Sequence, residues 1–106
     1  MIYYKKNTRQ YPETTSVIVA MCDENLIGKK LVDEKTALDL STYAGFYKGE
    51  LINAKQATEI IKQSYGDENT SFNLVGKETI AAASQVFSIT SARKIKNVPH
   101  LQIYSL

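Results

Sequence analysis

The sequence predicts a single α+β domain, in which a mixed, mostly antiparallel sheet of about five or six strands packs against two helices. Three observations predict this fold class. The 106 residues are 43% hydrophobic, which suffices for one modest core but not for two. The longest apolar run, residues 17–22, is typical of a central strand. Residues 54–65 and 77–87 carry apolar side chains at helical spacing.

The N-terminal part predicts two paired strands. Residues 1–6 begin with β-branched and aromatic side chains, which favour a strand. Pro12 cannot donate a ladder hydrogen bond, so we expect residues 7–14 to form a loop between antiparallel strands. The second strand, 16–22, lacks strict alternation, and this predicts burial on both of its faces.

Short segments separated by polar turns follow. Residues 23–25 supply Asp, Glu and Asn, which favour a turn. Residues 26–31 predict a return segment in which Gly28 marks a bulge or a close backbone approach. Residues 36–40 alternate as a half-buried strand does. Residues 41–51 predict a glycine-containing aromatic loop that caps the core or stacks on bases.

Two helices and the strand between them come next. Asn53 and Gln56 form a capping-box pattern, which predicts a helix over 54–65 that ends at Gly66. Residues 71–75 predict a strand, and a second helix over 77–87 follows Gly76.

A glycine before a helix can leave backbone N–H groups free for an anion, but one glycine is weak evidence of a site. The phosphate-binding patterns G-x-G-x-x-G and G-x-x-x-x-G-K are absent from the sequence.

The C-terminal part predicts two short strands, 93–96 and 101–104, with their apolar residues facing the core. Pro99 lies in the connection 97–100 and disfavours a regular central position there.

The charges are unevenly distributed along the chain. Residues 1–10 and 87–106 together carry +6 and no acid, whereas residues 11–86 carry −4, and the two parts give the net charge of +2. If the two ends meet in space, this asymmetry predicts a bipolar surface. The alternative is that basic edge strands only discourage aggregation.

Four blocks of the sequence carry a family resemblance. They are MCDENLIGKK at 21–30, FYKGEL at 46–51, NLVGKE at 73–78 and VPH at 98–100 with Gln102. In this order they resemble the archaeal family of small proteins catalogued as domain of unknown function 424. The resemblance implies an archaeal, cytoplasmic, single-domain α/β protein over residues 1–106, and it implies no activity.

The sequence offers little catalytic chemistry. Cys22 and His100 are the one thiol and the one imidazole, but Cys22 ends an apolar run, as a buried structural cysteine does. Their separation fits no zinc-site spacing, and the acid pairs at 23–24 and 33–34 are typical of solvated turns. We therefore expect no enzyme, no cofactor and no metal.

The same features bear on location and partners. The apolar run of six residues is far shorter than the roughly 18 needed to span a bilayer, and no apolar leader follows the basic N-terminus. A lone cysteine forms no internal disulfide. We expect a cytoplasmic protein with no membrane partner and no disulfide-linked partner.

Two functions of different classes are compatible with these observations. The first is non-enzymatic binding of RNA, with ribosomal RNA and neighbouring ribosomal proteins as expected partners in archaeal translation, through basic N- and C-terminal strands that lie side by side. The second is a small-molecule-binding protein or enzyme that uses a polar cluster of Asn73, Glu78 and His100. The candidate RNA-binding residues are Lys5, Lys6, Arg9, Lys29, Lys30, Tyr47, Lys48, Arg93, Lys94, Lys96 and His100.

Overall fold

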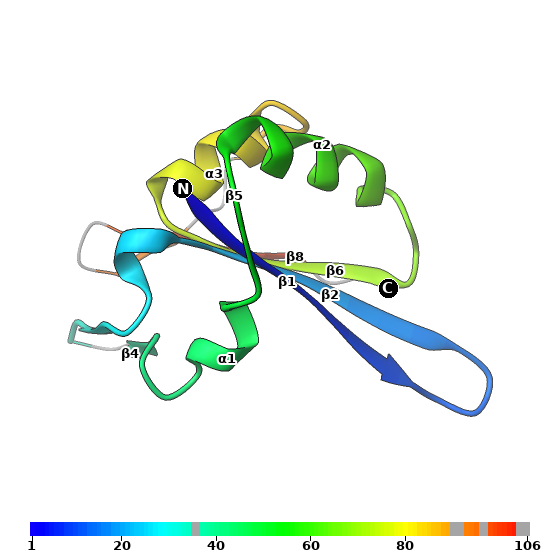
Figure 1. The fold of residues 1–106 in the computed structure, drawn as a ribbon, viewed down its shortest axis with the longest axis horizontal. Helices are drawn as coiled ribbons and strands as arrows, with labels where there is room; N and C mark the ends of the chain where they lie inside the picture. The colour runs from blue at the N-terminus through cyan, green and yellow to red at the C-terminus, as the bar shows by residue number, and fades with distance from the viewer. Residues whose placement is uncertain (35–36, 90–92, 96–97, 104–106) are drawn as a thin grey trace.

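A computed structural model describes residues 1–34, 37–89, 93–95 and 98–103 (Figure 1). The elements are, in chain order, β1 (Ile2–Gln10), β2 (Thr15–Asp23), the 3-10 turn η1 (Glu24–Leu26), β3 (Lys30–Val32), β4 (Ala37–Asp39), α1 (Ala44–Tyr47), β5 (Glu50–Ile52), α2 (Ala54–Ser64), β6 (Thr70–Val75), α3 (Lys77–Ser84), β7 (Arg93–Ile95) and β8 (Val98–Ile103). The predicted α+β fold class is confirmed.

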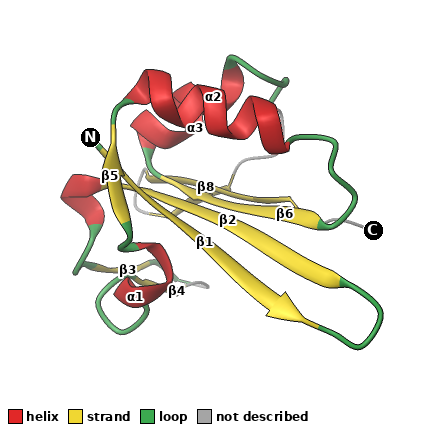
Figure 2. Ribbon diagram, turned by 45° about the vertical axis from the view of Figure 1, so that its right-hand side comes forward, coloured by secondary structure: helices red, strands yellow, loops and turns green. Residues whose placement is uncertain are grey.

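The main sheet has the strand order β5-β1-β2-β6-β8-β7. Among the described strands, β2 and β6 form the parallel pair and the other neighbours are antiparallel. Helices α2 and α3 cover one face, while α1 and the small β3–β4 sheet lie against part of the other (Figure 2). The strand predicted to be central, β2, lies between β1 and β6.

The strand β2 is buried on both faces, as predicted. Val19 and Met21 belong to a cluster under the helices, and Ala20 and Cys22 belong to a second cluster on the opposite face. Successive residues of a strand point to opposite faces of the sheet, and both faces of β2 are buried against an apolar cluster. This explains why the apolar run of β2 is unbroken.

The capping box of α2 is confirmed. The Asn53 Oδ1 atom accepts from the Gln56 backbone N–H (2.8 Å), and the Asn53 N–H donates to Gln56 Oε1 (2.9 Å). Gly66 follows the helix with a φ of 95°, which an L side chain rarely adopts. This helix therefore begins where the sequence predicts and ends within one residue of the predicted position.

Helix α3 is shorter than predicted, since it ends at Ser84 and not at Phe87. The backbone N–H groups of Gln85 and Val86 bond to carbonyls three residues back, so the last turn leaves α-helical geometry. Phe87 still packs against the helix-side cluster and stacks on Tyr65, with ring centroids 4.7 Å apart.

Two predicted loops contain regular structure. The first strand continues to Gln10, because all nine residues of β1 pair with β2, and a tight turn over 11–14 replaces the predicted loop 7–14. The segment 41–51 contains α1 and most of β5, both of which the sequence analysis missed. The predicted segments 26–31 and 36–40 meet as β3 and β4, outside the main sheet.

Pro99 lies inside β8, contrary to the prediction of a connecting turn over 97–100. Pairing between β8 and β6 begins at His100, so the missing N–H of Pro99 lies beyond that ladder. Its carbonyl accepts from the Gly76 N–H (2.8 Å). Ile95 and Leu101 are buried as predicted, and Tyr104 lies outside the described residues. In the described part of the chain, no helix is long and apolar enough to cross a membrane.

Candidate nucleic-acid interface

The sheet face opposite α2 and α3 is covered only in part. Cys22 and Val75 are buried there against residues of η1, α1 and the turn after β4. No described helix or strand lies beneath the other half of β1, β2 and β6 (Figure 2). We name this part the open sheet face; its residues are Arg9, Ser16, Ile18, Ser71 and Gln102, all half-buried or exposed, and Asn7 and Asn73 lie at its border with α1.

Strand register arranges these side chains in rows. Asn7 lies opposite Ile18, which lies beside Ser71 on β6. Asn73 lies opposite Gln102 in the next row. Opposite residues of neighbouring strands point to the same face, so polar groups from four strands lie on one side of the sheet.

Helix α1 is fixed at the border of the open sheet face by three hydrogen bonds. Lys5 Nζ donates to the Gly45 carbonyl (2.7 Å), and Asn7 Nδ2 donates to the Phe46 carbonyl (3.1 Å). The Tyr47 hydroxyl donates to Asn73 Oδ1 (2.9 Å). This short helix is therefore tied to both β1 and β6.

A hollow of about 520 Å³ lies where α1 meets β3 and β4; we name it the aromatic hollow. Tyr43 is 65% exposed at its wall. Phe46 and Tyr47 meet edge to face, with ring centroids 5.1 Å apart. The residues that line the hollow are Lys30, Ala37, Leu38, Asp39, Tyr43, Phe46, Tyr47 and Asn73.

The acid in this hollow is held in a turn. Asp39 Oδ1 accepts from the Thr42 N–H (2.9 Å), the Ser41 hydroxyl (2.7 Å) and the Ser41 N–H (3.0 Å). These hydrogen bonds, that of the Thr42 backbone first, hold the pKa of Asp39 well below its usual range. The carboxylate therefore stays charged and shapes the turn before α1.

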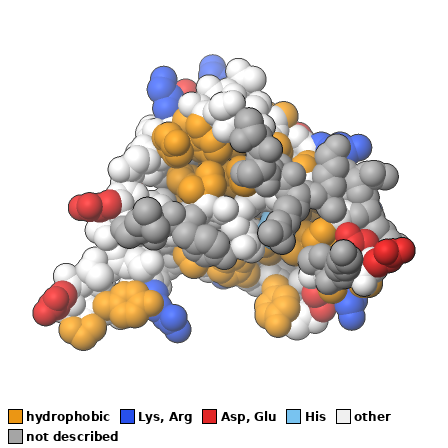
Figure 3. All heavy atoms as spheres, turned by 180° about the vertical axis from the view of Figure 1, so that it is seen from behind, with side chains coloured by type: hydrophobic (Ala, Val, Ile, Leu, Met, Phe, Trp, Pro, Cys, Tyr) orange, Lys and Arg blue, Asp and Glu red, His pale blue; other side chains and the backbone are white. Residues whose placement is uncertain are grey.

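The predicted basic residues are not on adjacent strands, so this part of the prediction is wrong. Strands β2, β6 and β8 separate β1 from β7, a distance of roughly 19 Å at about 4.8 Å per strand. In the view from behind, the described Lys and Arg side chains stand in separate places among acidic ones (Figure 3). Strand β1 instead forms part of the open sheet face, and β7 lies beyond β8 at one edge of the sheet.

The individual basic residues differ in placement. Lys5 and Arg9 lie on the α1 side of β1, whereas strand alternation places Lys6 on the helix side. The candidates that are exposed are Lys6, Arg9, Lys29, Lys30 and Lys48. Arg93 and Lys94 lie on the edge strand β7, and Lys96 lies outside the described residues.

Tyr47 does not have the predicted role. It is 3% exposed and its hydroxyl is bonded to Asn73, so its ring cannot stack on a base. Tyr43, from the same aromatic segment, is the exposed ring. The glycine-rich aromatic pattern indicated the segment, but which ring is exposed depends on how α1 docks on β1.

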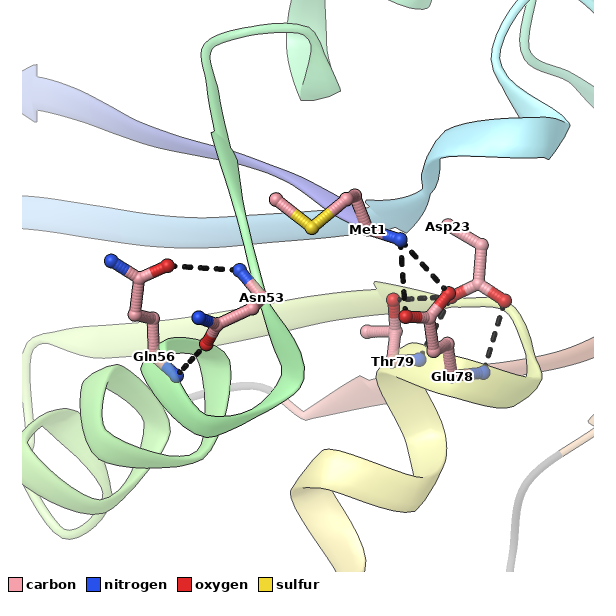
Figure 4. A network of polar contacts seen from close by, with 6 residues as sticks. All are labelled: Met1, Asp23, Asn53, Gln56, Glu78 and Thr79. Atoms are coloured by element: carbon pink, nitrogen blue, oxygen red, sulfur yellow. Dashed lines mark hydrogen bonds and ion pairs between the residues drawn. The ribbon is translucent and has the colours of Figure 1, made fainter.

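The start of α3 is occupied by a side chain of the protein itself. Asp23 is 6% exposed, and its carboxylate accepts from the Glu78 N–H (3.0 Å), the Thr79 N–H (2.8 Å) and the Thr79 hydroxyl (2.7 Å) (Figure 4). The interpretation of Asp23 as a solvated turn acid is therefore wrong. The backbone N–H groups of Glu78 and Thr79, which could otherwise bind a phosphate after Gly76, therefore donate to Asp23.

Two members of the polar cluster of the second hypothesis, Asn73 and Glu78, line different hollows. Asn73 and His100 lie on the same sheet face, since His100 pairs with Val75, but Asn73 lines the aromatic hollow. Glu78 instead lines a separate hollow of about 640 Å³ beside Asp23, where its carboxylate forms an exposed ion pair with the Met1 ammonium group (3.1 Å).

Cys22 is a buried thiol, as predicted. It is 0% exposed, and burial, followed by the charge of Asp23, raises its pKa to about 12. Within the described ranges, His, Cys, Asp and Glu side chains form no group of three placed to hold a metal ion.

The fold and site define a small α+β protein with a helix-backed mixed sheet and a partly open opposite face. The chain belongs to the family described as protein of unknown function (DUF424), whose model matches residues 12–106. The chain is similar to the crystal structure of an uncharacterized conserved protein from Methanopyrus kandleri, with 25% sequence identity and a TM-score of 0.76. The match covers 99% of this chain and 91% of the chain from Methanopyrus kandleri. No curated protein matches the sequence.

Proposed function

We propose that this protein binds RNA through the open sheet face, with ribosomal RNA as the expected partner and archaeal translation as the setting. The observation that carries the proposal is the polar character of this face together with its borders. Strand β1 brings Arg9 to one side, and β7, which carries Arg93 and Lys94 in sequence, forms the opposite edge of the sheet. Lys30 lies at the aromatic hollow beside the face.

This arrangement suits RNA on chemical grounds. Arginine and lysine contact phosphates and position the chain, whereas amides and hydroxyls can bond to bases and to the 2′-hydroxyl group. Ser16 supplies a hydroxyl group on β2, opposite the exposed Arg9 on β1. The open sheet face therefore combines both kinds of contact.

The experiment compares two charge reversals. R9E/K30E changes one cation on the open sheet face and one at the aromatic hollow, and K55E/K62E changes cations on exposed positions of α2. Binding of labelled ribosomal RNA fragments is measured by fluorescence anisotropy at several salt concentrations. For R9E/K30E we expect weaker RNA binding and a weaker dependence on salt. Each lost phosphate contact lowers the magnitude of the slope of log affinity against log salt concentration by about 0.7 to 0.9, so the loss of two contacts should lower it by roughly 1.4 to 1.8.

The outcomes separate the possibilities. Equal losses from the two double variants would mean generic charge attraction and not this surface. No binding by the wild-type protein would overturn the proposal. Co-sedimentation with ribosomal subunits from an archaeal extract, and its loss in R9E/K30E, tests the ribosome as the location of the RNA.

A further inference from the structure

The aromatic hollow contains a large ring that the core does not use. Tyr43 is 65% exposed, in contrast to Tyr47 at 3%, although both come from the same short segment. An exposed ring beside a hollow offers a flat surface on which a base can stack, and every base has a π-face. Phe46 forms further apolar wall next to it.

A fixed amide lies in the same hollow. Asn73 Oδ1 accepts from the Tyr47 hydroxyl (2.9 Å), which fixes the plane of the amide and leaves its Nδ2 atom with two donor hydrogens. Because Asn73 stands on a sheet strand and its oxygen is anchored, the donors point in a set direction. Such a group can bond to a carbonyl oxygen or ring nitrogen on the edge of a base.

The remaining polar groups complete the pattern. Lys30 is exposed and lines the hollow, where its ammonium group can meet a phosphate. Asp39 Oδ1 is occupied by Ser41 and Thr42 and so shapes the turn. The volume of about 520 Å³ falls in the range of pockets that enclose small organic ligands.

We propose that the aromatic hollow receives one unpaired nucleobase of the bound RNA, an inference that rests on the proposed function. Tyr43 stacks on the base, Asn73 donates to its edge, and Lys30 meets an adjoining phosphate. A base in a duplex has its faces stacked and its pairing edge occupied, so it cannot enter. The hollow therefore selects single-stranded segments, loops or bulges over uninterrupted duplex.

The test uses fluorescence anisotropy with the full chain and three ligands. These are a labelled ten-nucleotide single-stranded RNA of mixed sequence, a labelled blunt RNA duplex that contains the same strand, and uridine monophosphate as competitor. The variants are Tyr43→Ala, Tyr43→Phe, and Tyr11→Ala as a control for an exposed tyrosine elsewhere, since Tyr11 lies in the β1–β2 turn and is 44% exposed. Thermal unfolding of each variant checks that it is folded.

We expect tighter binding of the single strand than of the duplex. Tyr43→Ala should weaken single-strand binding roughly 5- to 150-fold, the usual effect of losing one base–aromatic stack. Tyr43→Phe keeps the ring and should bind nearly as wild type, and Tyr11→Ala should show no change.

The possible failures are distinguishable. If the wild-type protein binds no RNA at all, the proposed function fails and this inference fails with it. If RNA binds but Tyr43→Ala has no effect, or the duplex binds equally well, only the inference is overturned. If uridine monophosphate competes as strongly as the oligonucleotide, the hollow is a site for free nucleotides and not for an RNA chain.

Discussion

Gly76 lies directly against the carboxylate of Asp23, so that a Cβ atom at position 76 would overlap that group. Its φ of 108° also lies in the region that L side chains rarely adopt. Through this contact the end of β2 and the start of α3 fit together, and the strand supplies the cap that the glycine lacks.

Replacing Gly76 with Ala should destabilise the protein more than the same change at Gly66. Both glycines have a positive φ, but nothing lies within 4 Å of a Cβ at Gly66. Gly66→Ala should cost about 1 kcal/mol from backbone strain, and Gly76→Ala roughly 1 to 3 kcal/mol more from overlap with Asp23. Urea unfolding measures both values, and equal losses would show that the Asp23 contact is unimportant.

Asp23→Ala should reduce the free energy of unfolding by roughly 2 to 4 kcal/mol. The change removes a helix cap and leaves the buried Thr79 N–H and hydroxyl without their acceptor. Glu24→Ala, at the exposed next residue, should stay within about 0.5 kcal/mol of wild type. Chemical denaturation monitored by circular dichroism compares the two, and similar losses would contradict a specific capping role.

Val19→Asp should prevent folding, because it places an unpaired charge under the helices at a position that is 2% exposed. Val32→Asp is the matched control, since Val32 is 44% exposed on the small sheet. Only the control should give a cooperative thermal transition. A soluble V19D protein that melts cooperatively would show that the centre of the sheet is misplaced.

The burial of Cys22 predicts a specific pH dependence of stability. Its pKa is raised from an ordinary 9.0 to about 12, so the folded state keeps the proton that the unfolded chain loses above about pH 9. Stability should therefore fall from pH 9 upward more steeply for wild type than for Cys22→Ala. Parallel curves, or rapid alkylation of the native protein at neutral pH, would indicate an accessible thiolate.

Much of the fold was predictable because it depends on local signals. The Asn53 cap specifies the start of α2, and the continuous apolar run of β2 indicates burial on both faces. Pro12 indicated a break, but its effect is confined to the turn because β1 pairs with β2 over nine residues. The pairing of β1 with β2 depends on residues outside the segment that is read, and so does the formation of α1 and β5. A local sequence pattern therefore does not predict these features.

The candidate site was less predictable for the same reason. Charge counting along the chain singled out the two basic ends and placed their strands together, whereas strand order is a property of the whole sheet. Asp23 resembles any turn acid in sequence, and it becomes a helix cap only because β6 lies parallel to β2. The sequence does not show which of Tyr43 and Tyr47 is exposed, because their exposure depends on how α1 packs against the sheet.

The parallel pairing of β2 with β6 also has a kinetic consequence. Val17 pairs with Thr70, 53 positions later (70 minus 17), so the chain must close a long loop before these strands meet. The β1–β2 hairpin needs only the turn over 11–14 and can form first. We therefore expect closure of the 24–69 segment to limit the folding rate, and weakened β1–β2 contacts to slow folding more than weakened β6–β8 contacts do.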